Sequence, residues 1–344
     1  NEFSCDYRGC DLSRCFTGSE RIACMSGSNE QQLKNLFILC DQNHFWKDFQ
    51  DIGNRIIRQV KDVAVHILPS QFTADVIPDT AWQHPSITVS FVANYKFKPS
   101  RGPLFHNRAI GKLDQYEILR NAGIPSPHVE VHSPEKSFEE DVWGRFVVIK
   151  PADLKQTSNK DNVRLVRTRR LNQLGDDLHS LLGYEPGTQL LIQSFIDTGP
   201  NPQHYRVLSL FAEPLYAQHK ILHRLRPDLS EPDEVLQEAV VADGSGEATR
   251  EFGDYPDVVA FGREIAGAFD QIPLLGIDIL KEVATGKLFA LEVNAGGNTW
   301  HFSSPSSAWR RAENPQQARA MKEQLSAFDA AARALIRQTR LHAA

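Results

Sequence analysis

The segment from Gly276 to Asn294 constrains the fold more than any other part of this sequence. Two runs of apolar and β-branched residues flank the turn-like tetrapeptide Ala284-Thr-Gly-Lys287, so the segment predicts a β-hairpin. Counting outward from the turn places Asp278 opposite Glu292, to within one residue of register. Because strand side chains alternate between faces, Glu292 and Asn294 share a face, and three oxygen-bearing side chains converge on one side of an apolar ribbon.

Three such side chains on one face indicate a site for a divalent cation. Carboxylates that oppose each other in a half-buried sheet repel, and one of them loses its charge unless a cation lies between them. Hard cations bind carboxylate and amide oxygens, and Mg²⁺ usually completes its shell with water and nucleotide phosphates. The sequence therefore predicts metal ligands at Asp278, Glu292 and Asn294. The alternative interpretation is a solvated polar face on an edge hairpin.

The composition is that of an ordinary globular protein. Of 344 residues, 41% are hydrophobic and 24% are charged, and this length suits two or three domains. The formal net charge of −5 disfavours a nucleic-acid partner, because phosphates need a basic surface. Apolar runs stay well below the ~20 residues that span a bilayer, and no secretory h-region is found, so we expect no membrane partner and a cytoplasmic location.

The cysteines are concentrated at the start of the chain. Four of the five lie in the first 24 residues, and their spacing does not match the paired knuckles of common zinc sites. This segment also lacks hydrophobic periodicity, and Met25 opens a natural-looking start. We therefore expect residues 1–25 to be a disordered or non-native leader, with a metal or disulfide cluster as the alternative. Cys40 closes an apolar run and is expected to be a buried strand residue.

Residues 26–105 alternate predicted strands with a helix. The strands are expected at 36–40, 63–68 and 86–92, and the helix at 45–63. This alternation favours a small parallel α/β domain. The region contains no G-x-G-x-x-G fingerprint, so a dinucleotide site there is poorly supported.

Predicted strands dominate the rest of the chain. A helix at 112–122, which Gly123 stops, comes first. Further strands are expected at 146–150, 163–167, 189–195, 205–211, 215–219, 276–282 and 288–294. Residues 227–255 are acidic, glycine-containing and aperiodic, which predicts an excursion or a loop. Helices are expected at 256–269 and, as one amphipathic helix, at 316–341.

The run Gly276-Ile-Asp-Ile-Leu, followed by Leu291-Glu-Val-Asn, resembles the C-terminal metal motif of ATP-grasp ligases. That superfamily includes D-alanine–D-alanine ligase, glutathione synthetase, biotin carboxylase and ribosomal-protein glutamate ligase. In it, the matching aspartate, glutamate and asparagine bind two Mg²⁺ ions that bridge the ATP phosphates. The resemblance covers residues 111–305 and implies these roles for Asp278, Glu292 and Asn294.

The resemblance also implies a fold. We expect an α/β (α+β) protein in which a two-subdomain ATP-grasp domain, residues 106–344, follows the small parallel domain. A lid subdomain at about 125–192 and a C-terminal subdomain at about 193–344 would hold the nucleotide between two mainly antiparallel sheets. A homodimer is left open, since many relatives are dimers.

Upstream segments resemble the nucleotide-binding parts of the family, in the order that the family requires. Lys112 opens a helix similar to one whose lysine contacts ATP phosphate, and Lys150 ends a strand whose lysine contacts the α-phosphate and adenine side. An ammonium on a flexible stem suits phosphate, although a single lysine at a strand end is usually solvated. The run 190–196 looks like the hinge strand that reads adenine. The residues assigned to this position are Gln193, Ser194, Phe195 and Ile196.

Candidate catalytic residues follow the hinge. Arg206 resembles an arginine that reaches phosphate or the substrate carboxylate. Lys220 and Arg224 lie on the next segment, where binding of an acyl phosphate and surface salt bridging both stay open. The catalytic set that the resemblance implies is Arg206, Lys220 and Asn294.

An acceptor pocket is expected beyond the metal motif, lined by Asn298, Trp300 and His301. A histidine titrates near neutrality, so His301 would assist deprotonation of an amine. The alternative is that His301 packs beside the tryptophan without a catalytic role.

Two departures from the family pattern affect the lid and the hinge. The family usually has a glycine-rich loop after the strand lysine, whereas residues 152–162 contain no glycine. The phosphate donors that remain there are Thr157, Ser158 and Lys160. Gln193 stands where a glutamate is frequent, which removes a charge near the adenine amino group.

Together these features predict an enzyme, an ATP-dependent carboxylate–amine ligase that forms a C–N bond through an acyl phosphate. The expected cofactors are ATP and two Mg²⁺ ions, with Mn²⁺ as an alternative metal. The expected substrates are a small carboxylate, amino-acid-like or peptide-like, and an amine acceptor. Two other functions stay open: a small-molecule kinase that phosphorylates a hydroxyl, and a nucleotide-responsive binding module that does not turn over.

Overall fold

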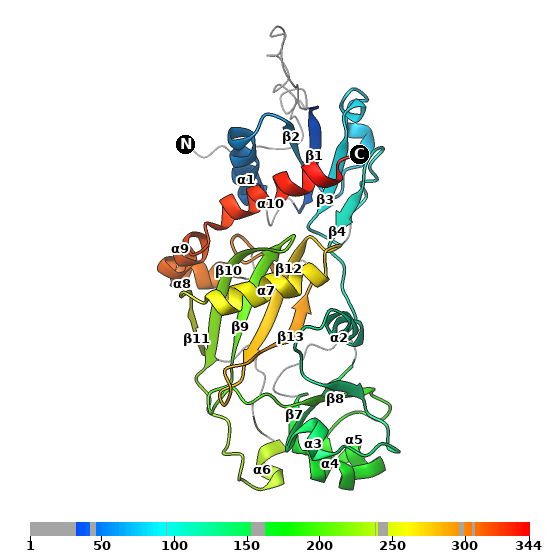
Figure 1. Ribbon diagram of the computed structural model, residues 1–344, viewed down its shortest axis with the longest axis vertical. Helices are drawn as coiled ribbons and strands as arrows, with labels where there is room; N and C mark the ends of the chain where they lie inside the picture. Colours follow the sequence, from blue (N-terminus) through cyan, green and yellow to red (C-terminus); the bar gives the residue numbers. More distant parts are fainter. Residues whose placement is uncertain are drawn as a thin grey trace. The chain divides into compact units, whose positions relative to one another are not determined.

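The computed structural model describes residues 32–41, 46–93, 95–152, 162–237, 239, 247–295, 299–304 and 307–344. These residues form one parallel and two antiparallel β-sheets with helices packed on them (Figure 1). The mixed α/β class expected from the sequence is therefore confirmed. Among the helices in the described ranges, none has the length and apolar character needed to cross a bilayer.

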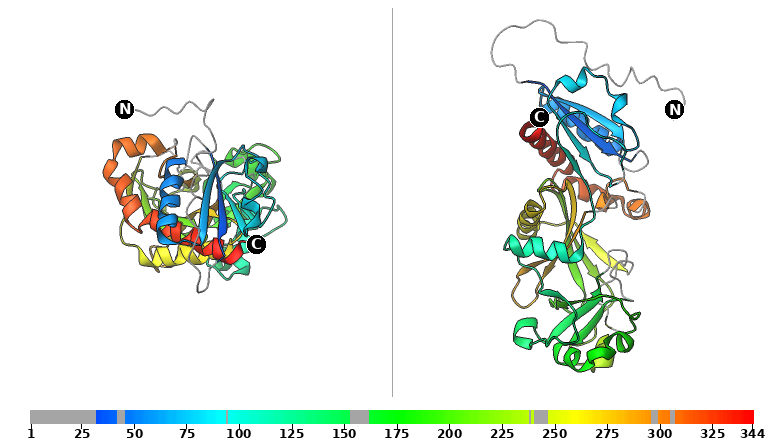
Figure 2. Two further views of the ribbon diagram at one scale, coloured as in Figure 1. Left: turned by 90° about the horizontal axis from the view of Figure 1, so that it is seen from above. Right: turned by 90° about the vertical axis from the view of Figure 1, so that its right-hand side faces the viewer.

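The first sheet is parallel, with strand order β2-β1-β3-β4. Its elements are β1 (Lys34–Cys40), α1 (Trp46–Gln59), β2 (Val63–Pro69), β3 (Ser86–Ser90) and β4 (Leu104–His106). The central strand β1 is fully buried from Leu36 to Cys40, as a strand covered on both faces requires. The C-terminal helix α10 (Ala327–His342) packs on α1 and on this sheet (Figures 1 and 2). The C-terminal helix therefore completes the hydrophobic core of the N-terminal sheet.

The second sheet is antiparallel, with strand order β5-β8-β6-β7. Its strands are β5 (Val129–Val131), β6 (Phe146–Pro151), β7 (Arg164–Arg167) and β8 (Leu190–Ser194), and its helices are α3 (Glu140–Trp143), α4 (Thr168–Leu174) and α5 (Leu178–Leu182). Side chains of β6 alternate between two clusters. Val147 and Ile149 pack with the helices, whereas Phe146 and Val148 belong to a separate cluster on the opposite face.

The third sheet is antiparallel, with strand order β11-β10-β9-β12-β13. Its strands are β9 (Gln203–Leu210), β10 (Glu213–Leu222), β11 (Ala248–Glu251), β12 (Leu274–Lys281) and β13 (Leu288–Asn294). Helices α2 (Lys112–Asn121) and α7 (Pro256–Ala268) cover one face, and Figure 1 shows α7 lying across the strands. The predicted hairpin at 276–294 is thus part of a larger sheet, formed by β12 and β13.

The other face of the third sheet is divided along the length of its strands. At one end, Leu208 and Leu274 pack into the core that also contains α10. At the other end of the same two strands, Arg206 and Asp278 line a cavity. One end of each strand is therefore packed in the hydrophobic core, and the other end lines the polar cavity. Packing of the buried end fixes the position of the polar side chains.

One prediction of secondary structure is wrong, and one is incomplete. The single helix at 316–341 is two helices, α9 (Pro315–Glu323) and α10, because Ser326 has a left-handed backbone, with a φ of 50°, that a right-handed helix does not continue through. The segment 227–255, predicted as an excursion or a loop, contains two short elements that were not predicted, α6 (Asp233–Gln237) and β11. Both elements are too short to show a hydrophobic period. A further short helix, α8 (Ala308–Glu313), precedes α9.

Helix α6 lies in an excursion between β10 and β11 that packs on the second sheet. Leu236 is fully buried in the cluster that contains Phe146 and Val148. Arg167, on β7, forms an ion pair with Asp233 and donates to the carbonyl oxygen of Glu231 at 2.6 Å. The excursion therefore connects the second and third sheets a second time, in addition to the segment that joins β8 to β9.

Candidate functional site

A cavity of about 340 Å³ is lined jointly by the second and third sheets. Its walls come from β6 and β8 on one side, from β9, β10, β12 and β13 on the other, and from the segment that joins β8 to β9. The predicted site residues in this lining are Lys150, Gln193, Phe195, Ile196, Arg206, Lys220, Asp278 and Glu292. Lys112, Ser194 and Asn294 are described but lie outside the lining. The fold thus brings most of the predicted residues to one place.

Lys150, at the end of β6, contacts the amide of Gln193 on β8. Its Nζ donates a hydrogen bond of 2.7 Å to Gln193 Oε1. The hydroxyl of Tyr116, on α2, lies 3.1 Å from the same oxygen and 2.7 Å from the carbonyl oxygen of Leu291 on β13. These contacts join the two sheets through α2, so the position of Lys150 is set by both walls of the cavity.

Burial disfavours the charged form of Lys150. Desolvation lowers the pKa of Lys150 to about 8, although the attraction of Glu292 opposes this shift, and the repulsion of Lys112 adds to it. Lys112 is itself buried, and its Nζ donates to the carbonyl oxygen of Pro151 at 3.0 Å. Two lysine side chains therefore lie near the end of β6, where a bound anion would favour the charged form of Lys150.

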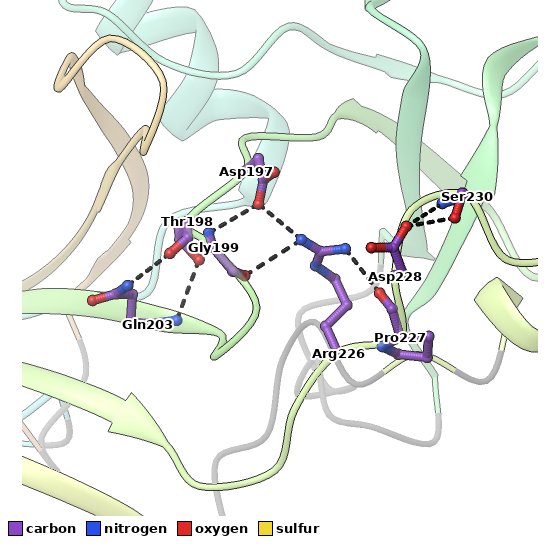
Figure 3. Close-up of polar contacts among 8 residues, drawn as sticks. All are labelled: Asp197, Thr198, Gly199, Gln203, Arg226, Pro227, Asp228 and Ser230. Carbon is purple, nitrogen blue, oxygen red and sulfur yellow. Dashed lines mark hydrogen bonds and ion pairs between the residues drawn. The ribbon is translucent and has the colours of Figure 1, made fainter.

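Arg226 holds the segment between β8 and β9 in shape (Figure 3). Its Nη2 donates to Asp197 Oδ1 at 3.0 Å and to the carbonyl oxygen of Gly199 at 3.4 Å. The guanidinium carbon lies 5.7 Å from the ring centroid of Phe195, within range of a cation–π interaction. Asp197 Oδ1 also accepts a bond of 2.9 Å from the backbone N–H of Gly199. The Arg226 side chain is only 7% exposed, so these bonds are protected from solvent.

Three of the four predicted hinge residues reach the cavity. Gln193, Phe195 and Ile196 line it. Ser194 exchanges hydrogen bonds with His128 instead: its Oγ accepts from His128 N, and its N–H donates to His128 O, both at 2.9 Å. Ser194 therefore fixes the strand end, and its neighbours present side chains to the cavity.

Asp278 on β12 opposes Glu292 on β13, as the hairpin pattern predicts, with a bulge directly after Asp278. Arg206, on the neighbouring strand β9, donates to both oxygens of Asp278, at 2.8 Å and 2.7 Å. Burial disfavours the charged form of Asp278, but the attraction and hydrogen bonds of Arg206 outweigh it and hold the pKa of Asp278 below its usual value. Asp278 is therefore an ionised carboxylate at neutral pH.

The donor set of the hairpin fits a hard divalent cation. Asn294 Nδ2 donates to Asp278 Oδ2 at 3.2 Å, and rotation of this amide would present its oxygen instead. A carboxylate offers about four lone-pair positions, of which Arg206 and Asn294 use three. Within the described residues, no group of three or more His, Cys, Asp or Glu side chains is placed to hold a metal ion. An ion here would need water or phosphate ligands as well, as Mg²⁺ usually does.

Cationic and polar side chains occupy the other half of the same sheet face. Lys220 on β10 lies opposite His204 on β9 and opposite Arg250 on β11. Burial lowers the pKa of His204 to about 4, although Asp278 lies 3.8 Å away and opposes the shift. His204 is therefore neutral at pH 7. The face changes from acidic at β12 and β13 to cationic at β10 and β11.

The residues after β13 have different environments. Trp300 is fully buried, and its Nε1 donates to Asp48 on α1 at 2.8 Å, so it packs in the core and does not line the cavity. His301 does line the cavity, and its Nδ1 lies 2.8 Å from Ser307 Oγ. The predictions for Thr157, Ser158, Lys160, Asn298 and the leader at 1–25 lie outside the described residues.

The sequence prediction missed two arginines that line the cavity. Arg226 lies two residues beyond Arg224, which is exposed and outside the lining. Arg250 lies on β11, within the segment expected to be a loop. The strand that carries Arg250 has only four residues, Ala248–Glu251, which are too few for a sequence period to be distinguished from chance.

Solved structures similar to this one include ATP-grasp ligases. D-alanine–D-alanine ligase from Bacillus anthracis, complexed with ATP, has 14% identity and a TM-score of 0.40, covering 90% of this chain and 99% of that chain. Macrocyclase MdnC from Microcystis aeruginosa MRC, bound to precursor peptide MdnA, has 13% identity and a TM-score of 0.46, covering 89% and 100%. The RiPP-associated ATP-grasp ligase of Chryseobacterium gregarium, with ADP and a leader and core peptide, has 12% identity and a TM-score of 0.48, covering 89% and 97%.

No protein-family model matches the sequence, and no curated protein matches it. The three similar structures have identities of 12–14% and TM-scores below 0.5. The chemistry therefore has to follow from the residues of this chain.

Proposed function

We propose that this chain is an ATP-dependent, Mg²⁺-requiring carboxylate–amine ligase that forms a C–N bond through an acyl phosphate. The observation that carries the proposal is the position of Asp278 and Glu292, which oppose each other and share one cavity with Lys150 of the other sheet. A carboxylate pair on one wall and a buried ammonium on the other suit a magnesium-bound triphosphate between them.

The proposed nucleotide site has a part for each end of ATP. Phe195 and Ile196 would cover the face of adenine, and the backbone after β8 would read its edge. Lys150 and Lys112 would bind phosphate oxygens, an interaction that raises the lowered pKa of Lys150 because it favours the charged form. Magnesium, two ions in this proposal, would neutralise phosphate charge when bound, and its ligands would be Asp278, Glu292 and Asn294. The proposed nucleotide-binding domain is 106–344, with subdomains at 125–192 and 193–344.

Arg206 and Lys220 are proposed to stabilise the phosphoryl group during transfer. Both line the cavity: Arg206 lies on β9, next to the strand that carries Asp278, and Lys220 lies on β10, one strand further away. Arg206 is already fixed by its two bonds to Asp278, so little reorganisation is needed when charge develops on the transferred group.

The proposed reaction has two steps. A carboxylate oxygen of the first substrate attacks the γ-phosphorus, the bond to the β–γ bridging oxygen breaks, and ADP leaves. The amine of the second substrate then attacks the acyl carbon, the bond between that carbon and the phosphate oxygen breaks, and inorganic phosphate leaves with the electron pair. His301 would accept the proton of the amine; in support, it lines the cavity, and its Nδ1 lies 2.8 Å from Ser307 Oγ.

The test is ADP release from Mg·ATP with pools of amino acids and short peptides, together with mass spectrometry of the products. We expect ADP and an amide in equal amounts, and only when the pool supplies both a carboxylate and an amine. Asp278→Asn and Glu292→Gln should abolish both products. Glu282→Gln, at the turn of the same hairpin, should have no effect.

Two outcomes would contradict the proposal. A stable phosphorylated product without an amide would make the protein a small-molecule kinase. Tight binding of Mg·ATP without any ADP would make it a nucleotide-responsive binding module.

A further inference from the structure

We propose that Gln193 lets the nucleotide site accept the 6-oxopurine triphosphates GTP and ITP as well as ATP. This inference rests on the proposed function, because it concerns the base of the nucleotide that the same cavity would hold. Gln193 is then a residue that determines specificity, and the nucleotide substrates are the purine nucleoside triphosphates as a class.

Gln193 lies among apolar side chains. Val148 is directly opposite it on β6, and both residues line the cavity. Binding sites of this kind are mostly apolar and fix the orientation of a ligand through a few polar groups. The amide of Gln193, a residue that is only 4% exposed, is such a group for a purine between the two sheets. Further apolar side chains of the same lining are Val163, Phe195, Ile196, Leu280 and Leu291.

Lys150 fixes the orientation of the Gln193 amide. Its Nζ donates to Gln193 Oε1 at 2.7 Å, and the hydroxyl of Tyr116 lies 3.1 Å from the same oxygen. An ammonium group carries only donors, so a rotated amide would place its NH₂ group against other N–H groups. In this structure Oε1 therefore faces Lys150, and Nε2 lies on the other side of the amide.

The NH₂ group of Gln193 is available to a ligand. In the described part of the chain, the amide makes its hydrogen bonds through Oε1, and Nε2 has no partner. Lys150, which is also buried, supplies a second donor beside it. A buried donor without an acceptor costs free energy, so a ligand that brings an acceptor to this position binds more tightly.

Two neighbouring donors match the edge of a 6-oxopurine. Guanine and hypoxanthine carry two adjacent acceptors, O6 and N7, whereas adenine carries N7 and an amino group at C6. Gln193 Nε2 would donate to O6. Lys150 has three N–H donors, so it can serve N7 as well as a phosphate oxygen.

Adenine fits the same site because an amide offers an acceptor as well as donors. When Lys150 binds a phosphate oxygen in the proposed complex, Gln193 Oε1 is released from it. Rotation about the last side-chain bond then presents Oε1 to the amino group of adenine. The hydroxyl of Tyr116 suits both orientations, since a hydroxyl donates and accepts. A glutamate here would offer only acceptors and would repel O6, so the amide is what admits both kinds of purine.

The test measures nucleotide binding, so it requires no knowledge of the carboxylate or the amine. Affinities of the full chain for Mg·ATP, Mg·GTP and Mg·ITP are measured by calorimetry, with Mg·CTP as a pyrimidine control. We expect GTP and ITP to bind within about threefold of ATP, and CTP to bind at least about tenfold more weakly, which corresponds to about one hydrogen bond. ITP lacks the 2-amino group of guanine, so equal binding of GTP and ITP assigns the effect to the 6-position.

Two results with the wild type would overturn the inference. One is an affinity for GTP and ITP that lies about tenfold or more below the affinity for ATP. The other is an affinity for CTP equal to that for ATP, because the site would then not distinguish between bases.

The variant Gln193→Glu tests the residue itself. The ratio of the affinity for ATP to the affinity for GTP or ITP should rise by about tenfold or more, because O6 then meets a carboxylate. The ratio is the relevant quantity, since the new charge also acts on Lys150 and so on the binding of every nucleotide. Gln218→Glu places a carboxylate elsewhere in the same lining, and as the matched control it should leave the ratio unchanged. An unchanged ratio in Gln193→Glu, or an equal change in both variants, would overturn the inference.

The inference and the proposed function fail separately. If ATP binds and GTP and ITP do not, only the base selectivity is wrong. If all three purine nucleotides bind but none yields a nucleoside diphosphate with a carboxylate and an amine, the ligase proposal is wrong and the base selectivity stands. If no purine nucleotide binds, both are wrong.

Discussion

Arg206 donates two hydrogen bonds to Asp278, one to each carboxylate oxygen, from the adjacent strand of the third sheet. The Asp278 side chain is 9% exposed and that of Arg206 is 28% exposed. In such a pair each charge compensates the desolvation of the other, and removal of one partner leaves a buried charge without compensation. The same guanidinium also occupies oxygens that a metal ion would use.

Replacing Arg206 with methionine should therefore make stability depend on Mg²⁺. We expect a loss of about 3 kcal/mol, the cost of breaking a buried pair. Without the guanidinium, the carboxylates of Asp278 and Glu292 repel each other more strongly. Binding of a divalent cation between them should then stabilise the variant more than it stabilises the wild type. Thermal unfolding with and without millimolar MgCl₂ should show a larger stabilisation by Mg²⁺ in the variant than in the wild type.

The matched variant is Asp278→Asn, which removes the metal ligand and keeps the shape of the side chain. Mg²⁺ should not stabilise this variant. An equal response to Mg²⁺ in Arg206→Met and Asp278→Asn would show that the ion binds elsewhere.

The affinity for ATP should fall as the pH rises above about 8. Lys150 has a pKa of about 8 in the folded protein because of its burial, with Glu292 and Lys112 as its charged neighbours. Above this pH the ammonium loses its proton and its attraction for phosphate, which weakens binding by at most about tenfold per pH unit for one group. Affinity measured by calorimetry between about pH 6.5 and about pH 9.5 checks this expectation.

Two variants identify the titrating group. Gln193→Glu places a carboxylate where Lys150 Nζ now donates at 2.7 Å, so it should raise the pKa of Lys150 and move the fall in affinity to higher pH. Lys150→Met should bind ATP weakly, with no fall near pH 8. The same pH profile in Lys150→Met and in the wild type would assign the titration to another group.

The hairpin and its acidic pair could be predicted from the sequence because local features determine them. Two β-branched runs, the alternation of side chains and a turn that contains Gly286, with a φ of 71°, together place Asp278 opposite Glu292. The short apolar run Phe146–Ile149 likewise predicted the strand that Lys150 ends. None of these features depends on a distant part of the chain.

The cavity arginines at 226 and 250 could not be predicted, because their positions depend on tertiary contacts. Arg226 meets Asp197 from 29 positions away, across an entire pair of strands. Arg250 lines the cavity because β11 pairs with β10, which places Arg250 opposite Lys220. The helix break at Ser326 was missed for a related reason, since apolar periodicity continues through it while the backbone does not.

Replacing Asp62 with asparagine should weaken the attachment of α10 to the first sheet in a pH-dependent way. Arg340, on α10, donates to both oxygens of Asp62 at 2.8 Å, and these hydrogen bonds lower the pKa of Asp62. Because Arg340 is 45% exposed and solvent screens the pair, we expect a loss of about 1 kcal/mol at neutral pH.

The sign of this pH dependence follows from the direction of the shift. A carboxyl group with a lowered pKa in the folded state stabilises the protein above its unfolded pKa, and the stabilisation is lost as the pH falls through the folded pKa. The difference between wild type and Asp62→Asn in urea unfolding should therefore be constant from pH 7 to about pH 4.5 and shrink below it. A difference that persisted at the lowest pH would assign the effect to packing of the side chain.

Arg226 should set the affinity for ATP and have little effect on the chemical steps. Its guanidinium donates to Asp197 (Figure 3). The guanidinium carbon also lies 5.7 Å from the ring centroid of Phe195, a residue of the proposed hinge. Replacing Arg226 with glutamine should raise KM for ATP by about tenfold, as loss of a charged hydrogen bond does, and leave kcat within about twofold. Ser230→Ala removes a hydroxyl that donates to Asp228 in the same loop, and it is the matched control. A fall in kcat at unchanged KM would place Arg226 in the chemical steps, because only interactions specific to the transition state have that effect.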